Sequence, residues 1–311
     1  MRKLRVLTIS YSQSGQLDRV LDSIVGPLAR RGIEVVPGRL VPSENHPFPW
    51  PFFKFFNQFP ETVYEKATPA MLVGENGQPL DDVDFDLILL GYQVWFLSPS
   101  LPVSSFLNGD QAARLLEGRR VVTVIACRNM WLMAQERVKA HLIRLNAKLV
   151  DNIALTDAGS AALTFLSTPL WVLTGNRGPR FFGLIPRAGV PDADIHSASR
   201  FGEAIADRLR EDSEDTSAML TGLGAVHVNE MLIQSEKAGR RSFAAWGALL
   251  LWIGPPSSLP RRAVLCVFIV FLVLLILTVV PLVAAIKWAL RPFLREKLAR
   301  ERKFYAQPSG E

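Results

Sequence analysis

Short apolar runs alternate with amphipathic segments along the first 210 residues of the chain. The runs that read as buried strands are residues 4–9, 33–37, 85–91, 120–126 and 149–155. Between them, apolar residues recur at helical spacing over 17–28, 131–145 and 204–210. This alternation predicts an α/β fold, in which helices cover both faces of an open, doubly wound parallel sheet.

Three chemically rich loops follow the carboxyl ends of predicted strands. They are Ser10–Gln16, Tyr92–Pro99 and Cys127–Trp131. Ligands bind beyond these ends in open parallel sheets, so we expect the site there. The first loop combines hydroxyls and a glycine before a helix, which is typical of phosphate binding because the first N–H groups of a helix are unpaired. An ordinary serine-capped turn is the alternative interpretation.

The stretch from Pro42 to Asp84 has no convincing strand and is too long for a simple connection. Aromatic residues crowd its first half, and those expected to contact a substrate are Trp50, Phe52, Phe53 and Phe56. Prolines keep its start extended, while the later phenylalanines fit one or two helical turns. We interpret this insertion as an aromatic lid over the domain's own core, a hydrophobic substrate wall or a membrane-surface patch.

The last third of the 311-residue chain is different in character. Residues 263–286 carry no charge and are long enough to cross a bilayer core of about 30 Å. Residues 243–253 are apolar but too short to cross, which favours an interfacial or re-entrant segment. We therefore predict a sheet domain (1–212), a solvated linker (213–242) and a membrane-associated helical tail (243–311).

Most of the net charge of +6 lies in a basic tail, residues 287–303, with seven basic and two acidic residues. A basic cluster beside an apolar helix attracts anionic headgroups, so we expect membrane lipid as a partner and no nucleic acid. No signal-peptide pattern precedes the first strand, so we expect the sheet domain to face the cytoplasm at the inner (cytoplasmic) membrane. A single crossing would separate the basic tail from that domain. The alternatives are a hairpin with 243–253 as its other arm, and export of the tail.

Metal and hydrolase motifs are missing from the sequence. The four histidines lack ligand spacing, and the two cysteines, Cys127 and Cys266, form no paired motif. No Gly-x-x-x-x-Gly-Lys loop and no Gly-x-Ser-x-Gly elbow occurs. We therefore expect no metal, no nucleoside triphosphate chemistry and no catalytic triad.

Several motifs resemble the flavodoxin-like family. Ser10–Gly15 is similar to the flavodoxin phosphate loop, and Gly91–Trp95 is similar to the flavin-ring loop of flavodoxin-like reductases. Together with Pro47–Trp50 and Cys127–Gln135, they resemble the flavodoxin-like component of dialkylresorcinol biosynthesis, often labelled a condensing enzyme. The resemblance implies FMN as cofactor, oxidative aromatisation of a dialkyl cyclohexanedione, and a separate ketosynthase partner. Two features depart from the family: Gln16 stands where many flavodoxins have threonine, and small soluble electron carriers lack the hydrophobic tail.

The resemblance also implies roles for single residues. Those expected to contact FMN are Ser10, Ser12, Gln13, Ser14, Gly15, Gln16, Tyr92, Gln93, Val94, Trp95, Phe96, Cys127, Arg128 and Asn129. The first loop would bind the phosphate, and Tyr92 and Trp95 would flank the ring. As catalytic residues we expect Arg128, to stabilise negative charge, and Tyr92, the nearest candidate base. Core packing of the aromatic residues and a surface ion pair for Arg128 are the alternatives.

These features predict a membrane-associated, FMN-dependent oxidoreductase that acts on a hydrophobic polyketide-derived ring. Aromatisation in dialkylresorcinol biosynthesis is the specific hypothesis. An NAD(P)H-dependent quinone reductase is the second hypothesis, and a flavin-free scaffold that holds a ketosynthase at the membrane is the third. Flavin binding distinguishes the third from the other two.

Overall fold

The computed structural model describes residues 3–66, 68–80, 84–157, 159, 161–211 and 216–309. Its central sheet has the strand order β3-β2-β1-β4-β7-β8. The bounds are β1 Arg5–Ser10, β2 Glu34–Pro42, β3 Ala70–Val73, β4 Leu87–Tyr92, β7 Arg120–Cys127 and β8 Lys148–Thr156. Neighbouring strands pair in parallel except β3, which runs antiparallel to β2 at the edge.

The five parallel strands, numbered in chain order, lie as 2-1-3-4-5, which is the flavodoxin-like order of the doubly wound fold. The predicted fold class is therefore confirmed. Every residue of β4 is buried, as expected for a strand that is covered on both faces. The strand order switches between β1 and β4, so a ligand is expected beyond the carboxyl ends of these two strands.

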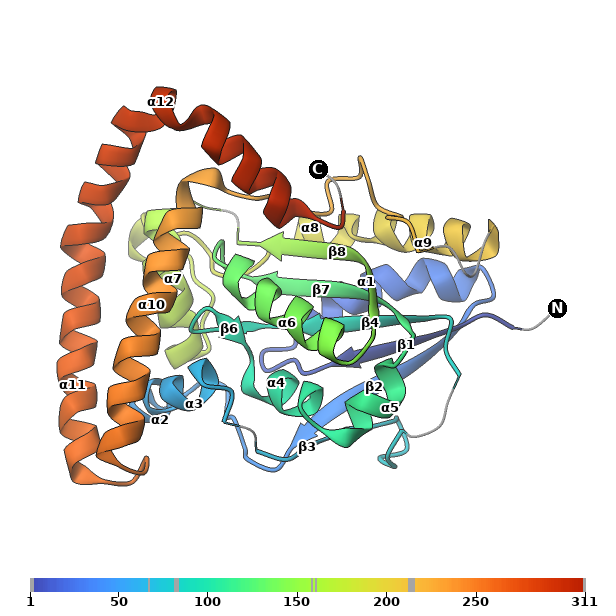
Figure 1. Ribbon diagram of the computed structural model, residues 1–311, viewed down its shortest axis with the longest axis horizontal. Helices are drawn as coiled ribbons and strands as arrows, with labels where there is room; N and C mark the ends of the chain where they lie inside the picture. The colour runs from blue at the N-terminus through green and yellow to red at the C-terminus, as the bar shows by residue number, and fades with distance from the viewer. Residues whose placement is uncertain are drawn as a thin grey trace.

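Helices cover both faces of the sheet (Figure 1). One face carries α1 (Gln16–Arg30), α8 (Asp192–Ser197) and α9 (Ser199–Glu211), and the other carries α4 (Leu101–Leu107), α5 (Asp110–Leu116) and α6 (Leu132–Arg144). The apolar stripe predicted for α1 is buried. α9 approaches α1 so closely that a Cβ at Gly202 would lie 1.9 Å from the Ile24 carbonyl oxygen. Only glycine fits at this crossing.

Extra segments cover the carboxyl edge of the sheet. They are α2 (Phe52–Asn57) and α3 (Phe59–Val63) from the insertion, the hairpin of β5 (Val94–Trp95) and β6 (Ser98–Pro99), α7 (Ala161–Thr174) and a 3₁₀ turn (Phe181–Gly183). The helical turns expected for the later phenylalanines are therefore present. The insertion also contains β3, which the sequence pattern did not reveal because this edge strand is only four residues long.

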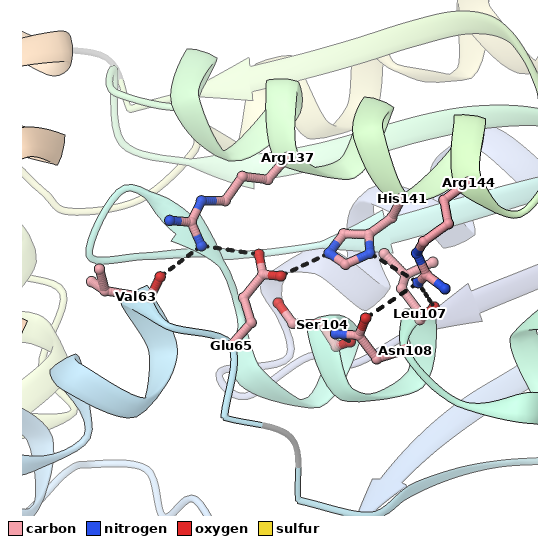
Figure 2. A network of polar contacts seen from close by, with 8 residues as sticks. All are labelled: Val63, Glu65, Ser104, Leu107, Asn108, Arg137, His141 and Arg144. Atoms are coloured by element: carbon pink, nitrogen blue, oxygen red, sulfur yellow. Dashed lines mark hydrogen bonds and ion pairs between the residues drawn. The ribbon is translucent and has the colours of Figure 1, made fainter. Parts of the chain in front are cut away.

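Polar contacts fix the end of the insertion against α6 (Figure 2). The Glu65 carboxylate accepts a hydrogen bond from Arg137 at 3.1 Å and pairs with His141 at 2.8 Å. Arg137 also donates to the Val63 carbonyl oxygen at 2.7 Å. Burial alone would raise the pKa of Glu65, but His141 and Arg137 hold it below its ordinary value. The insertion is therefore a fixed part of the fold.

The C-terminal part forms a helical hairpin that returns to the sheet domain (Figure 1). It consists of α10 (Glu230–Ile253), α11 (Leu259–Leu274), a π-helical segment (Leu275–Val279) and α12 (Val280–Ala306). The predicted linker, 213–242, is wrong in its second half, because α10 begins at Glu230. Before α10, the Ala225 carbonyl oxygen accepts a hydrogen bond from Ala154 of β8. Residues 212–215 of the predicted boundary lie outside the described residues.

One helix among the described residues, Leu259–Val279, is long and apolar enough to cross a membrane. It begins at Leu259, before the predicted residue 263, and its first turn contains Arg261 and Arg262. The predicted interfacial segment, 243–253, forms the second half of α10 and packs against α11, with the rings of Trp246 and Phe268 5.4 Å apart.

Candidate functional site

The loop between β1 and α1 has the backbone of an anion site. Gly15 has a φ of 75° directly before α1, in the left-handed region that favours glycine. The backbone N–H groups of residues 12–16 donate no hydrogen bond to another described residue. The Ser12 hydroxyl is buried beside Asp18 and makes no hydrogen bond of ordinary geometry there. Polar groups left unpaired at a helix N-terminus are ready to bind an anion.

The two glutamine side chains of this loop form hydrogen bonds to the backbone of segments that are distant in the chain. Gln13 Nε2 donates to the carbonyl oxygens of His46 and Pro47, at 3.2 and 2.9 Å. Gln16 exchanges two hydrogen bonds with the backbone of Val190, at 3.2 and 3.0 Å. Because both side-chain amides are engaged, an anion would meet only the backbone N–H groups of these two residues.

Asp18 in the first turn of α1 is the acidic neighbour of the loop. Burial raises the pKa of Asp18, while Ser12 and Arg39 act in the opposite direction. Ser10 Oγ donates to the Asp18 carboxylate at 3.5 Å, and Ser14 is half-buried in the loop. Among these serines, Ser12 is the one whose hydroxyl is buried without a hydrogen-bond partner of ordinary geometry among the described residues.

Four aromatic side chains gather beside the loop. The ring of Trp95 lies 6.1 Å from Tyr11, 5.2 Å from His46 and 5.5 Å from Trp50, measured between centroids. We call these four residues the aromatic cluster. They come from the β1 loop, the insertion and the β5–β6 hairpin. The structure therefore brings together Trp95, predicted to contact the cofactor, and Trp50, predicted to contact the substrate.

His46 is the polar member of the aromatic cluster. It is 6% exposed, and neither ring nitrogen has a hydrogen-bond partner among the described residues. Burial, with a smaller effect of Lys54, lowers the pKa of His46 to about 4. The ring is therefore neutral near pH 7, with one nitrogen able to accept a proton. The spacing of histidines in the sequence did not identify His46. His46 is a candidate base because it is buried in the aromatic cluster without hydrogen-bond partners among the described residues, and not because it could bind a metal.

The Tyr92 side chain does not reach the aromatic cluster. It is completely buried, and its hydroxyl donates to Gln135 of α6. Gln135 donates to Thr123, which donates to Asn152, so the hydroxyl belongs to a chain of hydrogen bonds inside the core. Burial raises the pKa of Tyr92 well above its ordinary value. The prediction that Tyr92 flanks the flavin ring and acts as the base is therefore wrong.

The hairpin after β4 directs two neighbouring rings to different places. Phe96 and Leu97 have positive φ values of 49° and 59°, in a two-residue turn that usually contains glycine or asparagine. Trp95 enters the aromatic cluster, whereas Phe96 packs against Phe55 at 5.0 Å. Left-handed conformations of bulky residues are strained and cluster at functional sites. Phe96 thus contacts the insertion, and its contact with FMN stays a prediction.

Two other predicted contacts form the base of this hairpin. The Gln93 carbonyl oxygen accepts a hydrogen bond from the Ser100 N–H at 2.8 Å, and Val94 pairs with Pro99. Both Gln93 and Val94 are half-buried at the carboxyl edge of the sheet. Their contact with FMN stays a prediction.

The loop after β7 holds the predicted residues Cys127, Arg128 and Asn129, all half-buried. Burial lowers the pKa of Arg128 to about 10, although Asp157, Cys127 and Glu236 act to raise it. Burial raises the pKa of Cys127 well above its ordinary value, and its Sγ lies 2.7 Å from the Arg128 carbonyl oxygen. Cys127 is therefore a thiol near pH 7, which suits a structural role. The role of Arg128 as a cation near the cofactor stays a prediction.

Glu236 of α10 is a buried acid that the sequence pattern did not reveal. It is completely buried, and one oxygen accepts a hydrogen bond from the Met133 N–H at 2.7 Å, at the start of α6. Its Oε2 has no hydrogen-bond partner among the described residues. Burial raises the pKa of Glu236 to about 8. Helical spacing could have found it, because Glu236 lies three residues after the buried Ile233 on the inner face of α10.

The predicted substrate contacts form two groups. The Trp50 ring is buried in the aromatic cluster, and the backbone N–H of Trp50 donates to the Val172 carbonyl oxygen of α7 at 2.9 Å. Phe52 and Phe53 are exposed, and Phe56 is half-buried with its ring 4.9 Å from Phe52. The set therefore extends from the surface to the cluster, and its contact with a substrate stays a prediction.

Neither a protein-family model nor a curated protein sequence matches this chain. Similar solved structures include a flavodoxin from the domain Archaea, 11% identical over 67% of this chain and 99% of that chain, with a TM-score of 0.36. A flavoprotein from Lactobacillus acidophilus in complex with FMN is 18% identical over 49% and 92%, with a TM-score of 0.34. RosB with a bound formylated riboflavin phosphate intermediate is 13% identical over 73% and 91%, with a TM-score of 0.33. The assignment of the fold rests on the strand order, since likeness at this level carries no conclusion about chemistry.

Proposed function

We propose that the chain binds FMN beyond the carboxyl ends of β1 and β4. The observation that carries this proposal is a loop of unpaired N–H donors, residues 12–16, directly beside the aromatic cluster. Backbone donors at a helix N-terminus suit a phosphate, and aromatic rings suit the flat faces of an isoalloxazine. Both features lie at the switch in strand order, which is where flavodoxin-like sheets bind FMN.

The residues of this site have separable tasks in the proposal. The β1 loop, with the Ser12 hydroxyl, would hold the phosphate, and Trp95 would contact the ring. FMN supplies reversible hydride transfer when bound. Arg128 would stabilise negative charge that develops on the substrate, because a fixed cation lowers the energy of an anion. His46 takes the place of Tyr92 as candidate base, since its unpartnered nitrogens lie in the aromatic cluster.

We infer that the substrate is a hydrophobic, polyketide-derived ring, and that the reaction is aromatisation of a dialkyl cyclohexanedione in dialkylresorcinol biosynthesis. The substrate would lose a hydride to the cofactor and an adjacent acidic proton to His46, so the ring is oxidised by two electrons. The motifs that resemble this family support the proposal, and so do the aromatic insertion and the apolar helix α11. A ketosynthase partner and a position on the cytoplasmic side of the inner membrane belong to the same proposal.

Titration of the full-length chain with FMN in detergent tests cofactor binding through flavin absorbance and fluorescence. Bound flavin should then be reduced anaerobically by a dialkyl cyclohexanedione. Reduction by NADPH and not by the dione would favour a quinone reductase. A chain that binds no flavin would contradict both enzymes and leave the scaffold.

The role of His46 is tested by the His46→Gln variant. It should still bind FMN, while flavin reduction by the dione slows by about 100-fold or more, because the amide cannot take a proton. Tyr92→Phe is the matched control, and its rate should stay within a few fold because the Tyr92 hydroxyl bonds to Gln135 in the core. If Tyr92→Phe alone slowed the reaction, Tyr92 would be the base after all.

A further inference from the structure

We propose that α11 lies in the plane of a membrane surface and inserts one face into a single leaflet, so that it anchors the chain without crossing the bilayer. This inference rests on the membrane association included in the proposed function, and it names the surface and its occupant, an anionic phospholipid leaflet. Length alone would permit crossing, because the 21 residues of Leu259–Val279 span about 30 Å. The contacts at the two ends of this helix favour the in-plane arrangement.

The first end of α11 is bound to the insertion of the sheet domain. Arg261 is 1% exposed, and its guanidinium makes two hydrogen bonds to the Glu61 carboxylate, at 2.8 and 2.7 Å. It also donates to the Asn57 side chain and carbonyl oxygen, at 3.1 and 3.0 Å. The Asn57 amide in turn donates to the Pro256 carbonyl oxygen at 2.8 Å. Breaking such a pair is unfavourable, because it leaves the buried guanidinium without a compensating charge.

The chain beyond α11 is bound to the same domain. Ser309 follows α12 and is buried, and its hydroxyl donates to the Asn152 carbonyl oxygen at 2.9 Å and accepts from the Asn152 N–H at 3.0 Å. On α12, Glu301 accepts hydrogen bonds from Gln234 and Lys237 of α10, at 2.9 and 2.8 Å. Figure 1 shows the result: α10 and α11 run side by side, and α12 returns to β8.

A crossing helix would place its two ends on opposite sides of the bilayer. The sheet domain would then lose one of the two sets of contacts, those of Arg261 or those of Ser309. An in-plane helix keeps both sets. It also keeps the inner face of α11 packed, where Phe268 stacks on Phe59 of α3 with 4.5 Å between ring centroids and Leu265 is buried.

The opposite face of α11 and of the π-helical segment that continues it is apolar and exposed. Its exposed residues are Leu259, Val267, Val270, Val273, Leu274 and Leu277. Phe52, Phe53 and Trp252 extend this apolar face at the first end of the helix, and aromatic rings favour membrane interfaces. Soluble monomers rarely expose a continuous apolar surface of this extent, so a hydrocarbon layer is the natural cover.

Charge identifies the layer as an anionic leaflet. Arg262 lies over the Phe53 ring at 4.4 Å, at the first end of the apolar face. The basic tail, residues 287–303, follows the apolar helix within α12, and its residues Arg295 and Lys297 are exposed. Positive charge before and after an apolar helix in the chain suits anionic headgroups around hydrocarbon. A second copy of the chain on this face would bring like charges together, which disfavours a dimer.

Rings lead from this face to the aromatic cluster. Phe52 lies 4.9 Å from Phe56, Phe56 lies 5.1 Å from Phe55, and Phe55 lies 5.9 Å from Trp50, measured between ring centroids. Trp50 in turn lies 5.5 Å from Trp95. A continuous row of ring contacts therefore joins the exposed apolar face to the aromatic cluster.

Depth measurements test the in-plane arrangement. Spin labels are attached to the Leu259→Cys, Val270→Cys and Leu277→Cys variants, each on a Cys266→Ser background, in the full chain bound to vesicles that contain anionic phospholipid. Relaxation by oxygen and by a water-soluble nickel complex gives the depth of each label. An in-plane helix gives similar, shallow depths at all three sites. A crossing helix puts Val270 deeper than both others by about 10 Å or more, since a helix rises 1.5 Å per residue.

The controls separate this inference from the proposed function. Ile143→Cys, exposed on α6, should report water, and the Cys266→Ser parent reports any label at Cys127. A deep Val270 with shallow ends would overturn the in-plane arrangement, and water at all three sites would overturn membrane insertion. FMN binding is measured on the same samples, so intact flavin binding with failed insertion would contradict this inference alone.

Discussion

Two regions of the molecule hold unsatisfied groups of opposite kinds. At the carboxyl edge of the sheet, polar atoms are buried without partners in the described residues: the Ser12 hydroxyl, both ring nitrogens of His46 and one oxygen of Glu236. Along α11 and the π-helical segment that continues it, apolar side chains are exposed without cover, with Val270 and Leu277 at 60% and 62%. The inner region lacks hydrogen-bond partners, and the outer region lacks an apolar environment.

This difference indicates what each region binds. A buried polar atom without a partner costs about 1 to 3 kcal/mol, so a polar ligand would stabilise the inner region. Exposed apolar surface costs about 25 cal/mol per Å², so an apolar medium would stabilise the outer region. The β5–β6 hairpin joins the two, because Trp95 packs in the aromatic cluster while Phe96 packs against Phe243 of α10, at 6.0 Å.

The largest expected effect concerns the buried carboxyl of the inner region. Burial raises the pKa of Glu236 from 4.5 to about 8. The unfolded chain releases this proton near pH 4.5, but the folded chain keeps it up to about pH 8. The contribution of Glu236 to stability is therefore complete below pH 4.5 and is lost as pH rises through this window. At about 1.4 kcal/mol per pKa unit, the loss reaches about 5 kcal/mol.

Glu236→Gln keeps the shape of the side chain and has no proton to lose. Its free energy of unfolding should match that of the wild type near the acidic end of the window and exceed it near pH 8, as measured by chemical denaturation in detergent. Glu211→Gln, at the exposed end of α9, is the matched control for loss of a charge. If the free energies of unfolding of Glu236→Gln and of the wild type changed with pH in the same way, Glu236 would not be a buried carboxyl with a raised pKa.

A second, smaller effect tests the anion site directly. Ser12→Asp places a carboxylate where we propose a phosphate, so affinity for FMN should fall by about 100-fold, because like charges in a confined site cost several kcal/mol. Ser12→Asn has the same size without the charge and should lose about tenfold or less. Fluorescence titration measures both variants. Equal losses would place the phosphate elsewhere.

The smallest effect concerns the outer region. Val270→Asp should weaken binding to anionic vesicles by about tenfold, because the carboxylate must leave water and faces like charge. Affinity for FMN should not change, since Val270 lies outside the aromatic cluster. Flotation with vesicles measures the first quantity, and Ile143→Asp on the exposed face of α6 is the matched control. If Val270→Asp bound vesicles as the wild type does but bound FMN poorly, the two regions would not bind separate ligands.

Part of the candidate site followed from the sequence, because loops after parallel strands must meet at one edge of the sheet. Trp95 and Arg128 were predicted at that edge and lie there. The Tyr92 side chain was predicted beside them and does not lie there, since alternate residues of a strand point to opposite faces and Tyr92 points toward α6, where its hydroxyl bonds to Gln135. Helical spacing could have placed Glu236 on the buried face of α10, but not its contact with Met133; His46 lay beyond prediction, because it acquires its character from segments far away in the chain.

The doubly wound sheet and the long apolar helix could be predicted from the amino-acid sequence, because burial repeats with the period of each element and is visible within a short window. Which rings meet, which polar atoms lack partners, and the return of both ends of α11 to one domain follow from the folded structure alone. These features depend on contacts such as that of Arg261 with Glu61, 200 residues apart, which no local pattern encodes.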